Sequence, residues 1–214
     1  MPHAIIETAI SCPHCDEPVP LNGPWEAVHC DHCQSDIDVP REFWADMLRS
    51  VLKDLPELEP GTGNNSTIFG TFRQTLLAGN LVPYCLACKT DFDPATMNPT
   101  MGSKACPKCG KSYIVTAAPE WLTELLPQVE YFMNAVLIDT SGEDSDKTAD
   151  RPVVFTCPQC GGALKIDGST RMVPCKFCNV DVYLPDDLWL RLHPAKKKER
   201  WFVVFNDTPL PEED

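Results

Sequence analysis

The residues with the clearest chemical potential are the twelve cysteines, which form six Cys-x-x-Cys pairs with none left over. A thiolate is a strong ligand for zinc, and two such turns can bring four sulfurs to one ion. The pairs combine into three sets, with 14, 17 and 14 residues between the two pairs of a set. The sequence therefore predicts three four-cysteine metal sites, made by Cys12, Cys15, Cys30 and Cys33, by Cys85, Cys88, Cys106 and Cys109, and by Cys157, Cys160, Cys175 and Cys178.

These thiols also allow chemistry other than zinc binding. The N-terminal residues show no positive stretch followed by an apolar run, so we expect a cytoplasmic chain whose cysteines stay reduced. Iron held by the same four thiolates, as in an electron carrier, is the main alternative. A thioredoxin-like redox pair opens a helix, whereas these pairs precede turn or strand signals. His14, His29 and His32 lie in or beside the first set. We expect them to be surface residues near a complete four-sulfur site.

The first cysteines of the three sets are 73 and 72 residues apart, which indicates an internal triplication. In each copy the second pair is followed by a proline and then a tryptophan, which is Trp44, Trp121 or Trp189. Each copy predicts a strand, a hairpin between the cysteine pairs, another strand, and a helix that begins at the proline. Proline suits the first helical turn, and the acidic residues after it favour the positive end of the helix.

The fold class that follows is a small, metal-stabilised α+β chain of three tandem modules. We place the modules at residues 1–56, 67–139 and 151–207, joined by linkers at 57–66 and 140–150. The predicted helices cover residues 40–55, 119–136 and 185–194, and Pro127 should kink or divide the second. Further strands are expected at 66–77, at 134–140 and, closing the third module, at 199–207.

The segments 12–33, 85–109 and 157–178 resemble zinc ribbons, the four-cysteine modules of transcription factors, RNA polymerase subunits and ribosomal proteins. The resemblance covers about a third of the chain. It implies that the twelve cysteines hold three structural zinc ions, and it implies nothing about a partner. The helix with its proline and tryptophan lies outside the general pattern of that family.

The charge of the chain limits its partners. The formal net charge is −13, and residues 1–60 alone hold twelve acidic and three basic residues. This sign disfavours general affinity for phosphate backbones. Residues 151–214 carry nine basic and nine acidic residues, so the third module offers a local contact for nucleic acid. Its basic residues include Lys165, Arg171, Lys176, Lys196, Lys197, Lys198 and Arg200.

Nothing in the sequence indicates catalysis or membrane insertion. No nucleophile and base stand at a recognisable spacing, and the stretch GTGNNST at 61–67 lacks the Gly-Lys-Ser/Thr ending of a phosphate loop. No apolar stretch is long enough to cross a bilayer. We expect a non-catalytic adaptor or scaffold with a protein partner. Its tryptophans could anchor that partner. A tryptophan beside a metal knuckle more commonly fills the core of its own module. Binding of nucleic acid or transcription machinery through the third module is the alternative, and iron-based electron transfer is less favoured.

Overall fold

The computed structural model describes residues 1–136, 154–166, 172–185, 188 and 197–211. It divides into two compact units, residues 1–139 with 197–214, and residues 140–196. We call the first the core unit and the second the ribbon insert, because the second interrupts the first in the sequence. The core unit holds the first two cysteine sets, and the ribbon insert holds the third.

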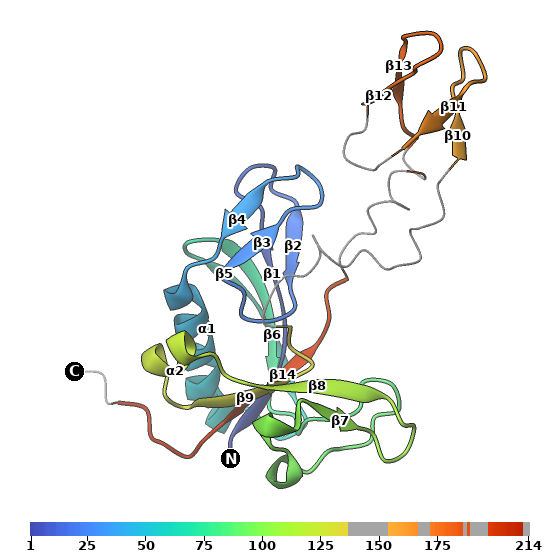
Figure 1. Ribbon diagram of the computed structural model, residues 1–214. Helices are drawn as coiled ribbons and strands as arrows, with labels where there is room; N and C mark the ends of the chain where they lie inside the picture. The colour runs from blue at the N-terminus through green and yellow to red at the C-terminus, as the bar shows by residue number, and fades with distance from the viewer. Residues whose placement is uncertain (137–153, 167–171, 186–187, 189–196, 212–214) are drawn as a thin grey trace. The chain divides into compact units, whose positions relative to one another are not determined.

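The core unit is built on one eight-stranded antiparallel sheet (Figure 1). Its strand order is β5-β6-β1-β14-β9-β8-β7, and β2 also pairs with β1. The bounds are β1 His3–Ser11, β2 Pro18–Leu21, β5 Gly63–Phe69, β6 Arg73–Gly79, β7 Ser103–Ala105, β8 Ser112–Ala117, β9 Val129–Met133 and β14 Trp201–Phe205. A separate hairpin joins β3, Ala27–His29, to β4, Asp36–Asp38. The first two modules therefore share a sheet instead of forming separate domains, which corrects the predicted boundary between them.

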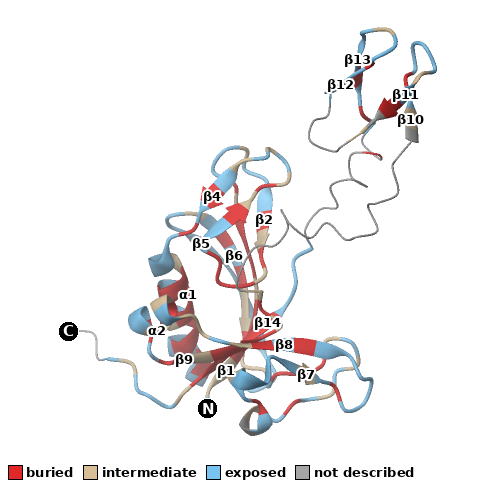
Figure 2. Ribbon diagram, in the orientation of Figure 1, coloured by how far each residue is buried: buried red, intermediate tan, exposed pale blue. Residues whose placement is uncertain are grey.

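Strand β14 is central to this sheet and pairs with both β1 and β9. All five of its residues are buried, because both faces of the sheet are covered at this strand (Figure 2). Trp201, Val203 and Phe205 join the apolar cluster on one face, and Phe202 and Val204 join the cluster on the other. The sequence predicts this strand as the last element of the third module, 151–207. The structure places it in the core unit, because its uninterrupted apolar run can be satisfied only by burial on both sides.

Helix α1, Arg41–Asp54, begins directly after Pro40, as the sequence predicts. Its buried face carries Trp44, Met47, Leu48 and other apolar residues into the first cluster. The Trp44 indole Nε1 donates a hydrogen bond to the Trp25 carbonyl at 2.7 Å. Trp44 is therefore a core residue and not a surface anchor. The helix is followed by the short 3₁₀ helix η1, Leu55–Glu57.

The second predicted helix, 119–136, is wrong over most of its length. Helix α2 covers only Glu120–Leu125, and the chain continues into strand β9. Leu126 has already left helical geometry, with φ −142° and ψ 83°. Pro127 explains this, because proline disfavours helical geometry in the preceding residue and cannot donate a helical hydrogen bond. The buried pattern of β9 then places Tyr131 and Phe132 on opposite faces of the sheet.

The predicted linker at 57–66 and the single strand predicted at 66–77 also need correction. This region forms the hairpin of β5 and β6, with Gly63 opposite Gly79 and Phe69 opposite Arg73. Gly70, between two apolar runs, is the turn signal for this hairpin. The start of β5 could not be predicted from apolar periodicity, because its residues are all exposed and mostly polar.

The ribbon insert contains two short hairpins. Its strands are β10 Val154–Thr156, β11 Ala163–Lys165, β12 Met172–Pro174 and β13 Asp181–Tyr183, paired in that order. Its main apolar cluster has four buried residues, Cys157, Leu164, Cys175 and Val182. The helix predicted after Pro185 lies outside the described residues except for Leu188, as do Trp189 and most of the strand predicted at 134–140. In the core unit two further 3₁₀ turns precede β7, η2 Pro94–Thr96 and η3 Pro99–Met101.

Candidate metal centres

All six Cys-x-x-Cys pairs adopt one backbone arrangement, which we call the knuckle. In the first, the Asp16 amide donates to the Cys12 carbonyl at 2.9 Å, and the Cys12 amide donates to the Glu17 carbonyl at 2.8 Å. The same two hydrogen bonds recur after Cys30, Cys85, Cys106, Cys157 and Cys175. This repeated turn points both sulfurs of a pair to the same side, which is why the Cys-x-x-Cys spacing can serve one ion.

Two knuckles meet in each centre, and their sulfurs are close without being bonded. Paired Sγ atoms lie 3.6 and 3.7 Å apart in the first centre, 3.5 Å in the second, and 3.7 and 3.6 Å in the third. Within each centre all four sulfurs lie within 4.8 Å of one another. A tetrahedron with zinc–sulfur bonds of about 2.3 Å has edges of about 3.8 Å, whereas a disulfide needs about 2.05 Å. The geometry fits three four-thiolate metal sites, at the twelve predicted cysteines.

Because the sulfurs are crowded together, neighbouring thiols of one centre differ widely in pKa. In the first centre the Ser35 hydroxyl, followed by its amide, lowers the pKa of Cys33 to about 6. At Cys15 the Glu17 amide acts to lower the pKa, but burial and the neighbouring thiols raise it to about 12. One thiolate is thus stabilised at the expense of the next. A divalent cation removes this conflict, because it stabilises all four thiolates together.

A left-handed residue follows the second cysteine of every knuckle. The sequence predicts this role for Gly110 and Gly161, and their φ values are 74° and 70°. The other four knuckles use residues with side chains at φ values between 58° and 62°. These residues, which the sequence analysis missed, are Asp16, Gln34, Lys89 and Asn179.

The second centre is also contacted by side chains that are not ligands. The Tyr113 hydroxyl lies 3.2 Å from the Cys85 sulfur and accepts a hydrogen bond from the Ala87 amide. Against the effect of burial, this hydroxyl helps to lower the pKa of Cys85 to about 6. The Thr90 hydroxyl lies 3.3 Å from the Cys88 sulfur. From the sequence, Tyr113 was predicted only as part of a strand. Its position four residues after Cys109 could have suggested a role beside the metal.

The two centres of the core unit are embedded in different apolar clusters. Cys12 and Cys30 pack with residues on the α1 side of the sheet, whereas Cys85 and Cys106 pack with Tyr131 and its neighbours in the other cluster. The remaining two sulfur ligands of each centre are less buried. Each centre therefore ties a pair of surface turns to one face of the same sheet.

The three histidines beside the first centre do not complete it. His14 and His32 are exposed, and His29 Nδ1 lies 2.8 Å from an Asp36 carboxylate oxygen. The four ligand atoms grouped there are all cysteine sulfurs. The structure therefore gives this centre the composition that the sequence predicts.

The basic residues proposed for nucleic-acid contact are divided between the two units. Lys198 and Arg200 belong to the core unit, where both lie against Glu7, at 3.3 Å and 2.8 Å. Lys176 is exposed beside the third centre, and Lys197 is exposed before β14. Arg171, Lys196 and the side chain of Lys165 lie outside the described residues.

Of the other two tryptophans that follow the cysteine sets, Trp121 and Trp189, only Trp121 lies within the described residues. It is partly buried at the start of α2, and the Arg41 guanidinium lies 5.5 Å from its ring centre.

Comparison of the chain with models of known protein families, with curated proteins and with solved structures finds no match. Among the residues described, no helix is long and apolar enough to span a membrane.

Proposed function

We propose that this chain is a non-catalytic zinc protein in which the ribbon insert acts as a docking module for a protein partner. Each four-thiolate group would hold one zinc ion and, with four protein ligands, would leave no open position for substrate. When bound, zinc would neutralise thiolate charge and cross-link two knuckles. Support for a structural role comes from the position of the sulfurs at the edges of apolar clusters.

The observation that carries the docking role is the exposed apolar surface of the ribbon insert. Phe177 is 71% exposed on the second knuckle, and Tyr183 is 55% exposed on β13. Met172 lies directly across from Tyr183 in the β12–β13 hairpin, so both side chains share one face. Val180, between the knuckle and β13, is 42% exposed. Aromatic residues are enriched at binding hot spots, and apolar patches on small domains commonly mark interfaces.

Connectivity supports the same role. The ribbon insert leaves the core unit after β9 and returns just before β14, and these two strands are hydrogen-bonded neighbours. A module placed in this way can carry a partner without interrupting the core sheet. The adaptor hypothesis therefore assigns stability to the core unit and recognition to the insert.

Affinity capture with the full zinc-loaded chain tests this function. A partner that depends on the insert should be lost when Phe177→Ala and Tyr183→Ser are combined. The partner should persist with Ile114→Ser, which changes an apolar residue that is 51% exposed in the core unit. Retention of the partner by the double variant, with zinc content unchanged, would contradict a docking role for the insert.

Nucleic-acid binding is the second candidate, and the pairing of exposed Phe177 with exposed Lys176 favours it. An aromatic ring can stack on a base while a nearby lysine contacts phosphate. The net charge of −13 opposes this function. Fluorescence anisotropy with single-stranded RNA and DNA at physiological salt decides between the candidates. Binding that weakens with salt and disappears with Lys176→Glu would support nucleic-acid recognition.

A further inference from the structure

Strand β5 leaves one side of the core sheet open. It stands first in the strand order, and among the described strands it pairs only with β6 (Figure 1). All seven of its residues are exposed, and Phe69 at its end is 78% exposed. An edge strand of this kind presents a row of backbone donors and acceptors that another strand can use.

The β5 edge lacks the features with which proteins usually prevent such pairing. Residues 61–72, GTGNNSTIFGTF, contain no charged residue and no proline. The opposite end of the sheet, β7, has three residues and carries Lys104, and β2 carries Pro18 and Pro20. The described strands of the two-stranded sheets are each three residues long. Among the described edges, β5 alone is both long and uncharged.

We propose that β5 pairs with β5 of a second copy of this chain, antiparallel and around a two-fold axis at Ser66. In this register Gly63 lies opposite Phe69 of the second copy, and Asn65 lies opposite Thr67. The same contacts occur again on the other side of the axis. An aromatic ring beside a glycine on a neighbouring strand covers backbone that is otherwise bare. A strand of unrelated sequence would gain the backbone hydrogen bonds but not the two glycine–phenylalanine pairs.

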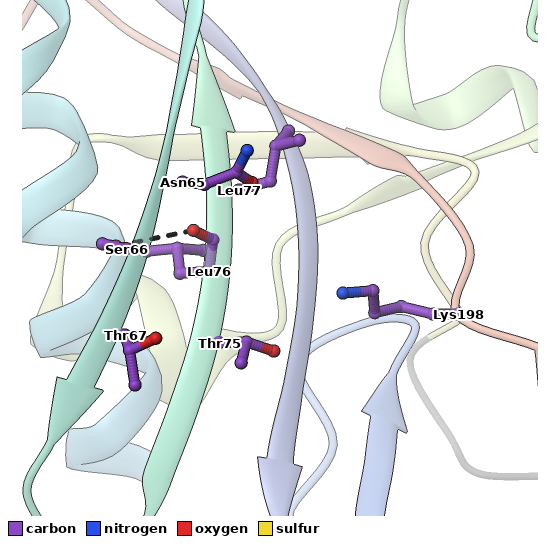
Figure 3. Close-up of a pocket in the computed structure, with 7 residues that line it drawn as sticks. All are labelled: Asn65, Ser66, Thr67, Thr75, Leu76, Leu77 and Lys198. Carbon is purple, nitrogen blue, oxygen red and sulfur yellow. Dashed lines mark hydrogen bonds between the residues drawn. The ribbon is translucent and has the colours of Figure 1, made fainter.

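The face of the β5–β6 hairpin is less suited to pairing than its edge. A hollow of about 260 Å³ opens on the hairpin (Figure 3), and its polar lining groups include the hydroxyls of Thr67 and Thr75. The Lys198 ammonium at its rim also bonds Glu7 at 3.3 Å. A partner laid on this face would have to displace water from these groups. Pairing through the edge adds hydrogen bonds and leaves the hollow hydrated.

The net charge of the chain predicts how this association depends on salt. Two chains of net charge −13 repel each other at long range, but the paired strands themselves are uncharged. Salt screens the repulsion without weakening the contacts, so the dimer should become tighter as ionic strength rises. A complex held by charge attraction to another molecule would respond in the opposite direction.

Sedimentation velocity of the zinc-loaded full chain, over a range of protein concentrations at low and high salt, tests the proposal. Ser66→Lys should weaken the dimer by about tenfold or more, because it sets two ammonium groups against each other at the axis. Phe69→Ala should weaken it less. The matched control is Ser103→Lys on β7, which makes the same substitution at an exposed position of the opposite sheet edge.

Both lysine variants lower the net negative charge, so a general charge effect would strengthen association in both. Weakening by Ser66→Lys alone, with tighter association of the unmodified chain at high salt, is the result that the proposal requires. A chain that stays monomeric at every concentration and salt level would overturn it. So would a dimer that Ser66→Lys leaves intact, or one that salt dissociates.

Discussion

The residue that follows each second cysteine shows how strongly the knuckles are determined. Glycine adopts a left-handed backbone easily, and asparagine and aspartate tolerate it. Gln34 and Lys89 adopt the same conformation at a cost of about 1 kcal/mol or more. Their amides donate to the carbonyls of Cys30 and Cys85 at 2.8 Å, which offsets part of that cost. The knuckle hydrogen bonds therefore impose the turn even where the sequence does not favour it.

Glu7 provides a test of electrostatics at the scale of one residue. Burial acts to raise its pKa, but hydrogen bonds from Arg200 and Lys198 outweigh burial and hold the pKa below its usual 4.5. Because the folded-state pKa is the lower one, the stabilisation is complete above pH 4.5 and is lost as the pH falls through the folded-state value. Glu7→Gln should lower the free energy of unfolding at pH 7 by roughly 1 kcal/mol or less, and urea titrations would measure it.

The difference between the Glu7→Gln and unmodified chains should shrink towards zero below pH 4.5, as Glu7 itself becomes neutral. Acid also protonates metal ligands, but both chains share this effect, so that their difference isolates Glu7. Glu57→Gln, at an exposed position of η1, is the control and should change little. A difference that is absent at pH 7, or undiminished in acid, would contradict the role given to Glu7.

At the scale of elements, the β9–β14 pair explains how the ribbon insert joins the core. Met133 lies opposite Phe202 in this pair. The Val136 amide donates to the Asn22 carbonyl at 2.9 Å, and the Asn22 side chain donates to the Lys197 carbonyl at 2.9 Å. Both ends of the inserted segment are therefore held at one residue of the core unit. This arrangement resembles a β-hairpin whose turn has been enlarged into a module.

A chain in which residues 137–196 are replaced by a short Gly-Asn-Gly turn should consequently fold. The turn suits a hairpin between antiparallel neighbours, and no strand of the core sheet is removed. We expect the shortened chain to bind two metal ions. By circular dichroism it should melt in a single cooperative transition, at a temperature close to that of the core unit in the full chain. As a control, the same shortened chain with Asn22→Ala should melt at a lower temperature. An unfolded or aggregated shortened chain would refute the separation of the two units.

Whether an element could be predicted from the sequence depends on whether its interactions are local or distant along the chain. The cysteine sets were predicted correctly, because the Cys-x-x-Cys spacing and the hairpin between pairs are local. The start of α1 after Pro40 was also local and was predicted. The position of β14 in the core sheet was not predicted, because its partners β1 and β9 are distant in sequence. The repeat pattern predicts separate modules, and it therefore gives no sign of the sheet that the first two modules share.

At the scale of the whole molecule, the two units should depend on metal to different degrees. The core unit has apolar clusters on both faces of its sheet. In the ribbon insert, two of the four residues of the main cluster are themselves cysteine ligands, Cys157 and Cys175. Small units that bury little apolar surface commonly need a disulfide or a metal to hold their fold. The insert is therefore the part whose structure we expect to depend most on a bound metal ion.

Native mass spectrometry of the full chain, purified under reducing conditions, tests the central claim most directly. It reads the number and identity of bound ions in one spectrum and separates them from the small mass loss of disulfide formation. We predict three zinc ions per chain, with every cysteine pair free of disulfide. Iron in place of zinc, fewer than three ions under saturating zinc, or mass losses from disulfides would contradict the assignment of three structural zinc centres.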